Sequence, residues 1–242
     1  MRPLVSAILG VLIVLPALAQ QPNYGGSVNG FPSWEERVVA QLTNRARVDP
    51  AADLANCQSG NCLESACYAA RAPLFWSYDL NQSARFHSAS MARFPFFAHD
   101  TPCQLFSDLD ARYPGTSDGS FASSCSASGT TTTQARVNLF GAGYGGENIA
   151  AGQTTPHTAF YGWLHEPTST SACGFTTQNG HRYNILTAGP GLGVGYAQVA
   201  GSPWTRYWTQ DFGGSGSIPK IPSGTHWTAA QRRDPTASDS NV

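Results

Sequence analysis

The sequence predicts an α+β fold that is stabilised by disulfide bonds. Three segments carry apolar side chains at helical spacing, and they begin near Ser33, Asp79 and Pro156. Late in the chain, strand-like composition occurs in LGVGYAQV and TRYWTQDF, and the turn-forming AGSPW between them indicates an antiparallel hairpin. Six cysteines follow a leader that is typical of secreted proteins, so we expect them to form cross-links.

The first helix is predicted to begin after Ser33 and to end at Asp49. Ser33 and Glu36 have the S-x-x-E spacing of a capping box, in which two free backbone N–H groups are satisfied reciprocally. Apolar residues then recur every three or four positions until Asp49-Pro50, where proline cannot continue the helical hydrogen bonds.

Two further helices are expected. One is predicted to be capped by Asp79 and to end before Pro95. The other is predicted to begin at Pro156, whose fixed φ suits the first helical position, and to stop at Pro167. The stretch 116–133 is rich in Ser, Thr and Gly and is predicted to be a surface loop.

The chain is expected to hold one secreted domain between two peripheral segments. Its first residues combine a charged start, an apolar run and the small-residue end Ala17-Leu18-Ala19, as in a cleaved signal peptide. The expected organisation is a signal peptide at 1–19, a polar leader at 20–32, a domain at 33–213 with a Ser/Thr/Cys-rich insert near 103–135, and a flexible tail at 214–242. We therefore expect a secreted, extracellular protein with no membrane span after signal cleavage.

The cysteines fall into an early and a late group of three. A zinc site in the early group is disfavoured, because its even spacing fits no common zinc motif. With three cysteines in each group, full pairing requires at least one bridge between the groups, while the remaining connectivity stays open. The candidates are Cys57, Cys62, Cys67, Cys103, Cys125 and Cys173.

The charge balance argues against a nucleic-acid partner. The formal net charge is −1, and charged residues make up 12% of the chain, about half the usual share. A protein that binds nucleic acid through its phosphates needs a basic surface, which this composition does not supply.

The segment GAGYGGENIAAG combines a glycine motif with an isolated carboxylate. Gly141, Gly143 and Gly146 fit the G-x-G-x-x-G pattern of dinucleotide-binding loops, and the RVNLF before them resembles a strand. The helix that such a site requires is interrupted by Gly152 and Pro156, so a dinucleotide site is disfavoured. Two other strings, GTSDG and HEPTS, lack the strand–helix context of a hydrolase nucleophile and the second histidine of a zinc protease.

The isolated carboxylates are the stronger signal. Between Val137 and Thr205 the only formal charges are Glu147, Glu166 and Arg182. A buried carboxylate needs a cation, strong donors or a metal, and histidines are the available partners. His99 in FFAHD and His181 in NGHRYNIL lie in segments that look like motifs. The other histidines are interpreted as incidental to the site: His87, His157, His165 and His226.

Four ordered motifs resemble the secreted CAP superfamily, also called the SCP domain, which includes cysteine-rich secretory proteins, antigen proteins and plant pathogenesis-related proteins. They are FFAHD, GGENIA, WLHE and GHRYNIL. The resemblance spans about 33–213 and includes LTNRARVDP, LNQSARFHSASMA and YWTQDFG. The form of GHRYNIL and the cysteine-bearing insert resemble bacterial members.

The resemblance implies a three-layer α-β-α sandwich with a small central antiparallel sheet and a cleft that holds His99, Glu147, Glu166 and His181. It implies that the two histidines bind zinc or another divalent cation, with the glutamates adjacent. The function expected is a non-enzymatic binding module for a metal and for a sterol, a lipid or an extracellular protein. The alternative is a metal-dependent hydrolase in which Glu147 or Glu166 acts as general base, and a third interpretation is a purely structural polar network.

Overall fold

The computed structural model describes residues 32–58, 60–113 and 124–214 of the chain. The predicted signal peptide, nearly all of the polar leader, the middle of the insert and almost the whole predicted tail lie outside the described residues. Within these three stretches no helix is long and apolar enough to cross a membrane.

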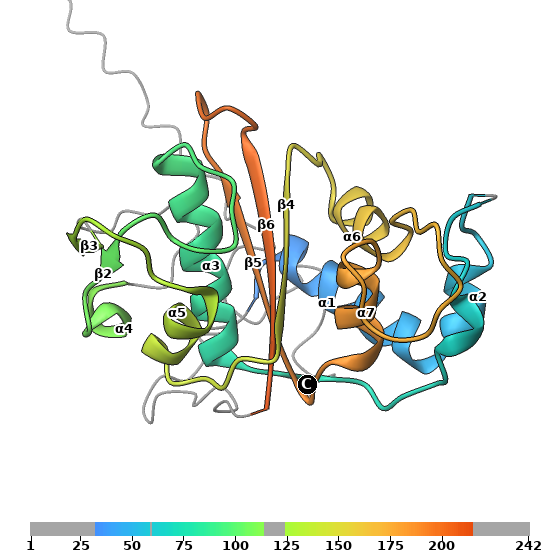
Figure 1. The fold of residues 1–242 in the computed structure, drawn as a ribbon. Helices are drawn as coiled ribbons and strands as arrows, with labels where there is room; N and C mark the ends of the chain where they lie inside the picture. Colours follow the sequence, from blue (N-terminus) through green and yellow to red (C-terminus); the bar gives the residue numbers. More distant parts are fainter. Residues whose placement is uncertain (1–31, 59, 114–123, 215–242) are drawn as a thin grey trace, which may run out of the picture.

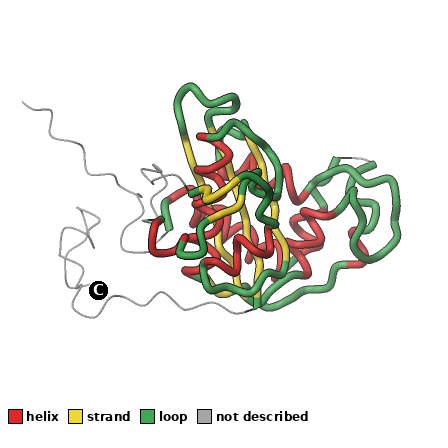
Figure 2. Tube along the Cα trace, turned by 60° about the vertical axis from the view of Figure 1, so that its left-hand side comes forward, coloured by secondary structure: helices red, strands yellow, loops and turns green. Residues whose placement is uncertain are grey.

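A four-stranded sheet stands between two layers of helices, as Figure 1 shows with the sheet nearly edge-on. Helices α3 and α5 cover one face, and α1, α6 and α7 cover the other; Figure 2 shows the same layering in a turned view. The strands follow the order β1-β5-β6-β4 and are β1 (Phe75–Trp76), β4 (Gly146–Ala151), β5 (Gly191–Gln198) and β6 (Arg206–Gly213). The expected α+β sandwich is therefore confirmed.

The β5–β6 hairpin predicted from the sequence is present, and β4 pairs antiparallel with β6. The short β1 is parallel to β5. A second sheet of two strands, β2 and β3, lies with α4 beyond α3 in Figure 1. The remaining elements are α1 (Trp34–Val48), α2 (Pro50–Leu54), η1 (Ser65–Cys67), α3 (Tyr78–Arg93), β2 (Gln104–Leu105), α4 (Leu109–Arg112), β3 (Cys125–Ala127), α5 (Thr133–Leu139), α6 (Pro156–Leu164) and α7 (Gly180–Thr187).

Helix α1 begins with the predicted capping box, and the same glutamate ties three elements together. Glu36 Oε2 accepts from the Ser33 backbone N–H at 2.8 Å, and Glu36 also forms a two-pronged ion pair with Arg85 of α3 at 2.8 and 2.6 Å. Its Oε1 accepts in addition from the Tyr196 backbone N–H of β5 at 3.3 Å. Both charged side chains are buried, so removal of either partner would leave an uncompensated buried charge.

Strand β5 presents a face without side chains to α3. Its alternating glycines lie on one face because successive residues of a strand point to opposite sides. A Cβ built on Gly193 would lie 2.1 Å from Asn81 N, and one on Gly195 would lie 2.1 Å from Ala84 C. Asn81 Nδ2 donates to Val194 O at 2.6 Å. The helix therefore rests on the sheet at backbone contact.

Three details of the predicted elements are wrong. The stretch 116–133, predicted to be a loop, contains the short strand β3. Helix α3 is capped by Ser77 and not by Asp79, because the Ser77 N–H donates to Leu192 O at 2.8 Å and so keeps Ser77 extended until the helix begins. The RVNLF segment is not a strand: its first four residues belong to α5, whose N-terminus is capped by Thr132. The helix predicted from Pro156 is confirmed as α6, with Thr155 as its cap.

All six cysteines are paired. Cys67–Cys173 links the early and late groups, as parity required, with a sequence separation of 106. The other two bridges, Cys57–Cys62 and Cys103–Cys125, each join cysteines of the same group. Cys103–Cys125 joins the residue before β2 to the first residue of β3 and so anchors the described part of the insert.

Candidate functional site

One cleft collects the four residues that the CAP resemblance implies. It is a cavity of about 540 Å³ whose lining includes His99, Glu147, Glu166 and His181, a volume within the usual range of small-molecule sites. His99 follows α3, and Glu147 lies in β4. Glu166 follows α6, and His181 is in the first turn of α7. Three aromatic residues also line the cavity: Tyr144, Phe175 and Tyr183.

The glycines before Glu147 shape the backbone around the cleft. Gly146 has φ +154°, and a Cβ there would lie 2.8 Å from the Asn184 side-chain oxygen. The same Asn184 donates through Nδ2 to Glu147 O at 3.2 Å and to Asn148 Oδ1 at 3.0 Å. These contacts dock α7 onto β4 and so join the two halves of the cleft.

His99 and Glu147 form the first half. His99 Nδ1 donates to Glu147 Oε1 at 2.8 Å, and the imidazole is 51% exposed while the carboxylate is buried. Arg136 of α5 forms an ion pair with Glu147 Oε2. Arg136 also donates to His99 O at 2.7 Å. One buried guanidinium therefore positions both the carboxylate and the backbone of the histidine.

His181 and Glu166 form the second half. His181 Nδ1 donates to Glu166 Oε2 at 2.6 Å, and Glu166 Oε1 accepts from the Arg182 backbone N–H at 2.9 Å. The first N–H groups of a helix have no partner within it, and the N-cap of α7, Asn179, supplies no side-chain hydrogen bond. Glu166 therefore satisfies the start of α7 and orients the adjacent imidazole at the same time.

The two histidines have the same protonation pattern. A carboxylate only accepts hydrogen bonds, so Nδ1 carries a proton in each ring, and in the neutral form of the ring the lone pair is on Nε2. Within the described residues, neither Nε2 has a hydrogen-bond partner. A histidine whose Nδ1–H is held by a carboxylate, with Nε2 free, is the arrangement found at many metal-ligating imidazoles.

The sequence alone did not identify Arg136 as the charged partner of Glu147. Burial raises the pKa of the Glu147 carboxyl, but the charge of Arg136 together with His87 and His99 outweighs burial and lowers the pKa to about 2. Arg136 lies just outside the charge-poor stretch that drew attention to Glu147, and its place in a helix facing β4 is set by tertiary packing. The expectation that histidines are the main partners is therefore incomplete.

Asp211 and His87 are further buried groups beside Glu147. Asp211 of β6 lies directly opposite Glu147 in the β4–β6 register. Burial, and then the charge of Glu147, raise the pKa of Asp211 well above its usual value. The His87 ring lies 3.9 Å from Glu147, its Nε2 donates to Ala98 O at 2.9 Å, and burial lowers its pKa to about 3.

His87 is therefore a buried neighbour of Glu147, but like His157 and His165 it is not among the residues that line the cleft. His165 Nε2 donates to Asp53 O at 2.9 Å, which is a structural contact. His157 is exposed on α6, and His226 lies outside the described residues.

Comparison with known proteins finds a distant likeness among solved structures. No family model matches the chain, and no curated protein matches it. Among solved structures, the chain is similar to the venom allergen-like protein 4 of Schistosoma mansoni, with 13% sequence identity, a TM-score of 0.38, and coverage of 77% of this chain and 94% of that chain. At this identity and score the likeness carries no inference about the cleft, so the α+β sandwich rests on the elements of the chain itself.

Proposed function

We propose that this chain is a secreted CAP-type binding module whose cleft binds a divalent cation through His99 and His181. The observation that carries the proposal is the pair of His–Glu contacts at one cavity, each of which leaves Nε2 free. The order of the four CAP-like motifs in the sequence supports it as well, because each motif contributes one of these residues.

Zinc fits this donor set best. Imidazole nitrogen is a good ligand for zinc, and a carboxylate behind each ring raises its basicity. No group of three or more His, Cys, Asp or Glu side chains in the described ranges is placed to hold a metal. Two imidazoles would therefore hold the ion, water would complete the coordination, and the affinity would be modest. A bound ion supplies positive charge and open coordination positions to a second ligand.

That second ligand is proposed to be a sterol, a lipid or an extracellular protein. Tyr144 and Phe175 line the cleft and are 40% and 62% exposed. Aromatic side chains that remain exposed at a concave site offer apolar area together with polar edges, as ligand sites commonly do. A ligand with an oxygen-bearing group for the cation and an apolar body for these rings fits the cleft.

The hydrolase alternative is less well supported. An efficient general base has a pKa near the working pH. The pKa of Glu147 is lowered to about 2, with Arg136 opposing the effect of burial, so its carboxylate is a weak base at neutral pH. Glu166 is already held by His181 and by the start of α7. These contacts favour binding over hydrolysis.

Calorimetric titration of zinc into metal-free protein at neutral pH tests the proposal. We expect uptake of one ion, loss of uptake in His99→Ala and in His181→Ala, and smaller uptake at pH 5, because metal binding requires neutral imidazole. His157→Ala is the matched control, since this histidine is exposed on α6 and away from the cleft lining. Unchanged uptake by the double variant His99→Ala/His181→Ala would overturn the proposal.

A further inference from the structure

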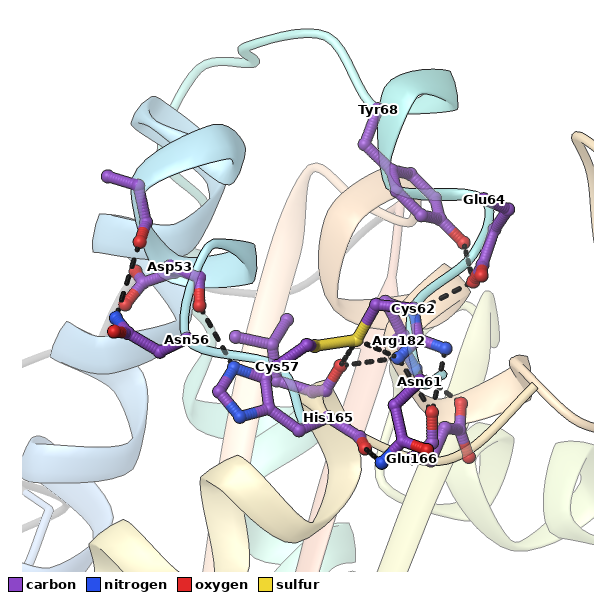
Figure 3. The surroundings of a disulfide bond; sticks show 12 residues. Asp53, Asn56, Cys57, Asn61, Cys62, Glu64, Tyr68, His165, Glu166 and Arg182 are labelled. Atoms are coloured by element: carbon purple, nitrogen blue, oxygen red, sulfur yellow. Dashed lines mark hydrogen bonds and ion pairs between the residues drawn. A yellow bond between two sulfur atoms is a disulfide. The ribbon is translucent and has the colours of Figure 1, made fainter. Parts of the chain in front are cut away.

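The Cys57–Cys62 disulfide lies against the buried side chain of Arg182, as Figure 3 shows. Arg182 is fully buried, and its Nη1 lies 2.9 Å from Cys62 Sγ. Its Nε donates to Glu64 Oε1 at 2.7 Å, and its remaining N–H groups bond the carbonyl oxygens of Leu164 and Glu166. A guanidinium is always charged, so a fixed positive charge touches one sulfur of this bridge.

The two sulfurs have different surroundings. Cys62 is only 4% exposed, whereas Cys57 is partly exposed. Cys62 also has φ +52°, a left-handed conformation that is unfavourable for a residue with a side chain. An incoming thiol therefore reaches the sulfur of Cys57 more readily than that of Cys62, whose backbone is held in an unfavourable conformation.

Thiol–disulfide exchange depends on these differences. An attacking thiolate bonds to one sulfur while the other leaves as a thiolate, and the reaction is faster when the leaving thiolate is stabilised. A cationic side chain against a cysteine stabilises its thiolate form. Arg182 contacts the sulfur that has to leave when attack occurs at Cys57, so access and charge favour the same direction of reaction.

We propose that Cys57–Cys62 is a thiol-exchange site for low-molecular-weight thiols. The thiolate of the small thiol attacks Cys57 Sγ and forms a mixed disulfide with it. The Cys57–Cys62 bond breaks, and its electron pair remains on Cys62 Sγ, which becomes a thiolate beside Arg182. One disulfide replaces another, so the step consumes no oxidant. A second small thiolate then attacks the small-thiol sulfur of the mixed disulfide, which forms the disulfide of the two small thiols and releases Cys57 as a thiolate.

The other two bridges of the chain are internal references. No arginine or lysine hydrogen-bonds to the sulfurs of Cys67–Cys173 or Cys103–Cys125 within the described residues. Cys173 is exposed, so if exposure alone governed exchange, Cys67–Cys173 would open before Cys57–Cys62. The order in which the bridges open therefore separates the effect of the guanidinium from simple access.

The test exposes the full-length oxidised protein to reduced glutathione for increasing times, blocks free thiols with an alkylating reagent, and maps the peptides by mass spectrometry. We expect glutathione on Cys57 and the alkyl group on Cys62, at times when at least ninety per cent of Cys67–Cys173 is intact. Glutathione on Cys62, or earlier opening of Cys67–Cys173, would overturn the proposal.

Two variants test the role of charge through the ratio of opening rates of Cys57–Cys62 and Cys67–Cys173 in the same molecule. Arg182→Gln is expected to lower this ratio at least fivefold, and Glu64→Gln, which removes the competing negative charge, is expected to raise it. A variant that is merely destabilised opens both bridges faster and leaves the ratio unchanged, which counts against the proposal. If Arg182→Gln does not fold, Glu64→Gln and the site of glutathione addition in the unmodified chain still decide the matter.

Discussion

Acidification should destabilise this protein through His87. Its pKa is lowered from 6.5 to about 3, first by burial and then by the charge of Arg136. Below pH 6.5 the unfolded chain therefore takes up a proton that the folded chain excludes. The stability is fully present above pH 6.5 and is lost as the pH falls towards 3. At about 1.4 kcal/mol per pH unit, the loss between pH 6.5 and pH 5 is about 2 kcal/mol.

Asp211 acts in the opposite direction. Its raised pKa means that the folded chain keeps a proton that the unfolded chain loses above its ordinary value of 3.8. The contribution of this carboxyl to stability is fully present below 3.8 and decreases as the pH rises. The pH dependence of the unmodified protein is therefore the sum of two opposing slopes, and a variant is needed to isolate that of His87.

The isolating variant is His87→Gln, because glutamine keeps an N–H donor for Ala98 O but does not titrate. Urea unfolding, followed by tryptophan fluorescence without reductant at pH 7, 6 and 5, gives the free energy of unfolding of both proteins. From pH 7 to pH 5, we expect the free energy of unfolding of the unmodified protein to fall by about 2 kcal/mol more than that of His87→Gln. His157→Gln, at an exposed site, should show no such shift. A constant difference between the unmodified protein and His87→Gln would refute the role of burial.

Two further predictions concern the frame of the fold. Gly193→Ala should lower the free energy of unfolding by about 3 kcal/mol or more, because its Cβ would lie 2.1 Å from helix backbone that cannot move aside. As its control in the same urea titration, Gly162→Ala should raise the free energy of unfolding by about 0.5–1 kcal/mol, because Gly162 is at an exposed helix position with nothing within 4 Å of the added Cβ. Replacing Cys67 and Cys173 together by serine opens a loop with a sequence separation of 106 and should cost about 5 kcal/mol by the chain-entropy model, measured as a lower thermal midpoint, whereas an unchanged midpoint would contradict the pairing.

Local signals in the sequence were sufficient for part of the fold. The capping box at Ser33, the proline at the start of α6 and the strand composition of the β5–β6 hairpin each act within a few residues, and all three features are present. Counting cysteines was enough to require a bridge between the early and late groups. Neighbouring residues alone could not show whether Ser77 or Asp79 caps α3. The cap depends on a hydrogen bond from the Ser77 N–H to Leu192 O of β5, which is far away in the sequence.

The candidate site was only partly predictable. The CAP-like motifs identified four lining residues of the cleft, but pattern alone could not find Arg136 or Asp211. Asp211 is buried beside Glu147 because two strands far apart in the sequence pair in one register. Arg136 reaches Glu147 from α5, which packs against α3. Helix α7 was also missed as an element, since its eight residues lack a capping side chain and a clear apolar face.

The glycine face of β5 fixes the position of one half of the cleft. Helix α3 meets Gly193 and Gly195 of β5 through main-chain atoms, so the spacing at these contacts does not depend on the size of a side chain. His87 of this helix holds Ala98, the neighbour of His99, which transmits that fixed spacing to the cleft. The other half of the cleft lies on the α6 and α7 side, and these helices pack on the opposite face of the sheet. Substitutions in that apolar core can therefore shift Glu166 and His181 while His99 keeps its place. The two halves of the cleft are thus free to evolve at different rates.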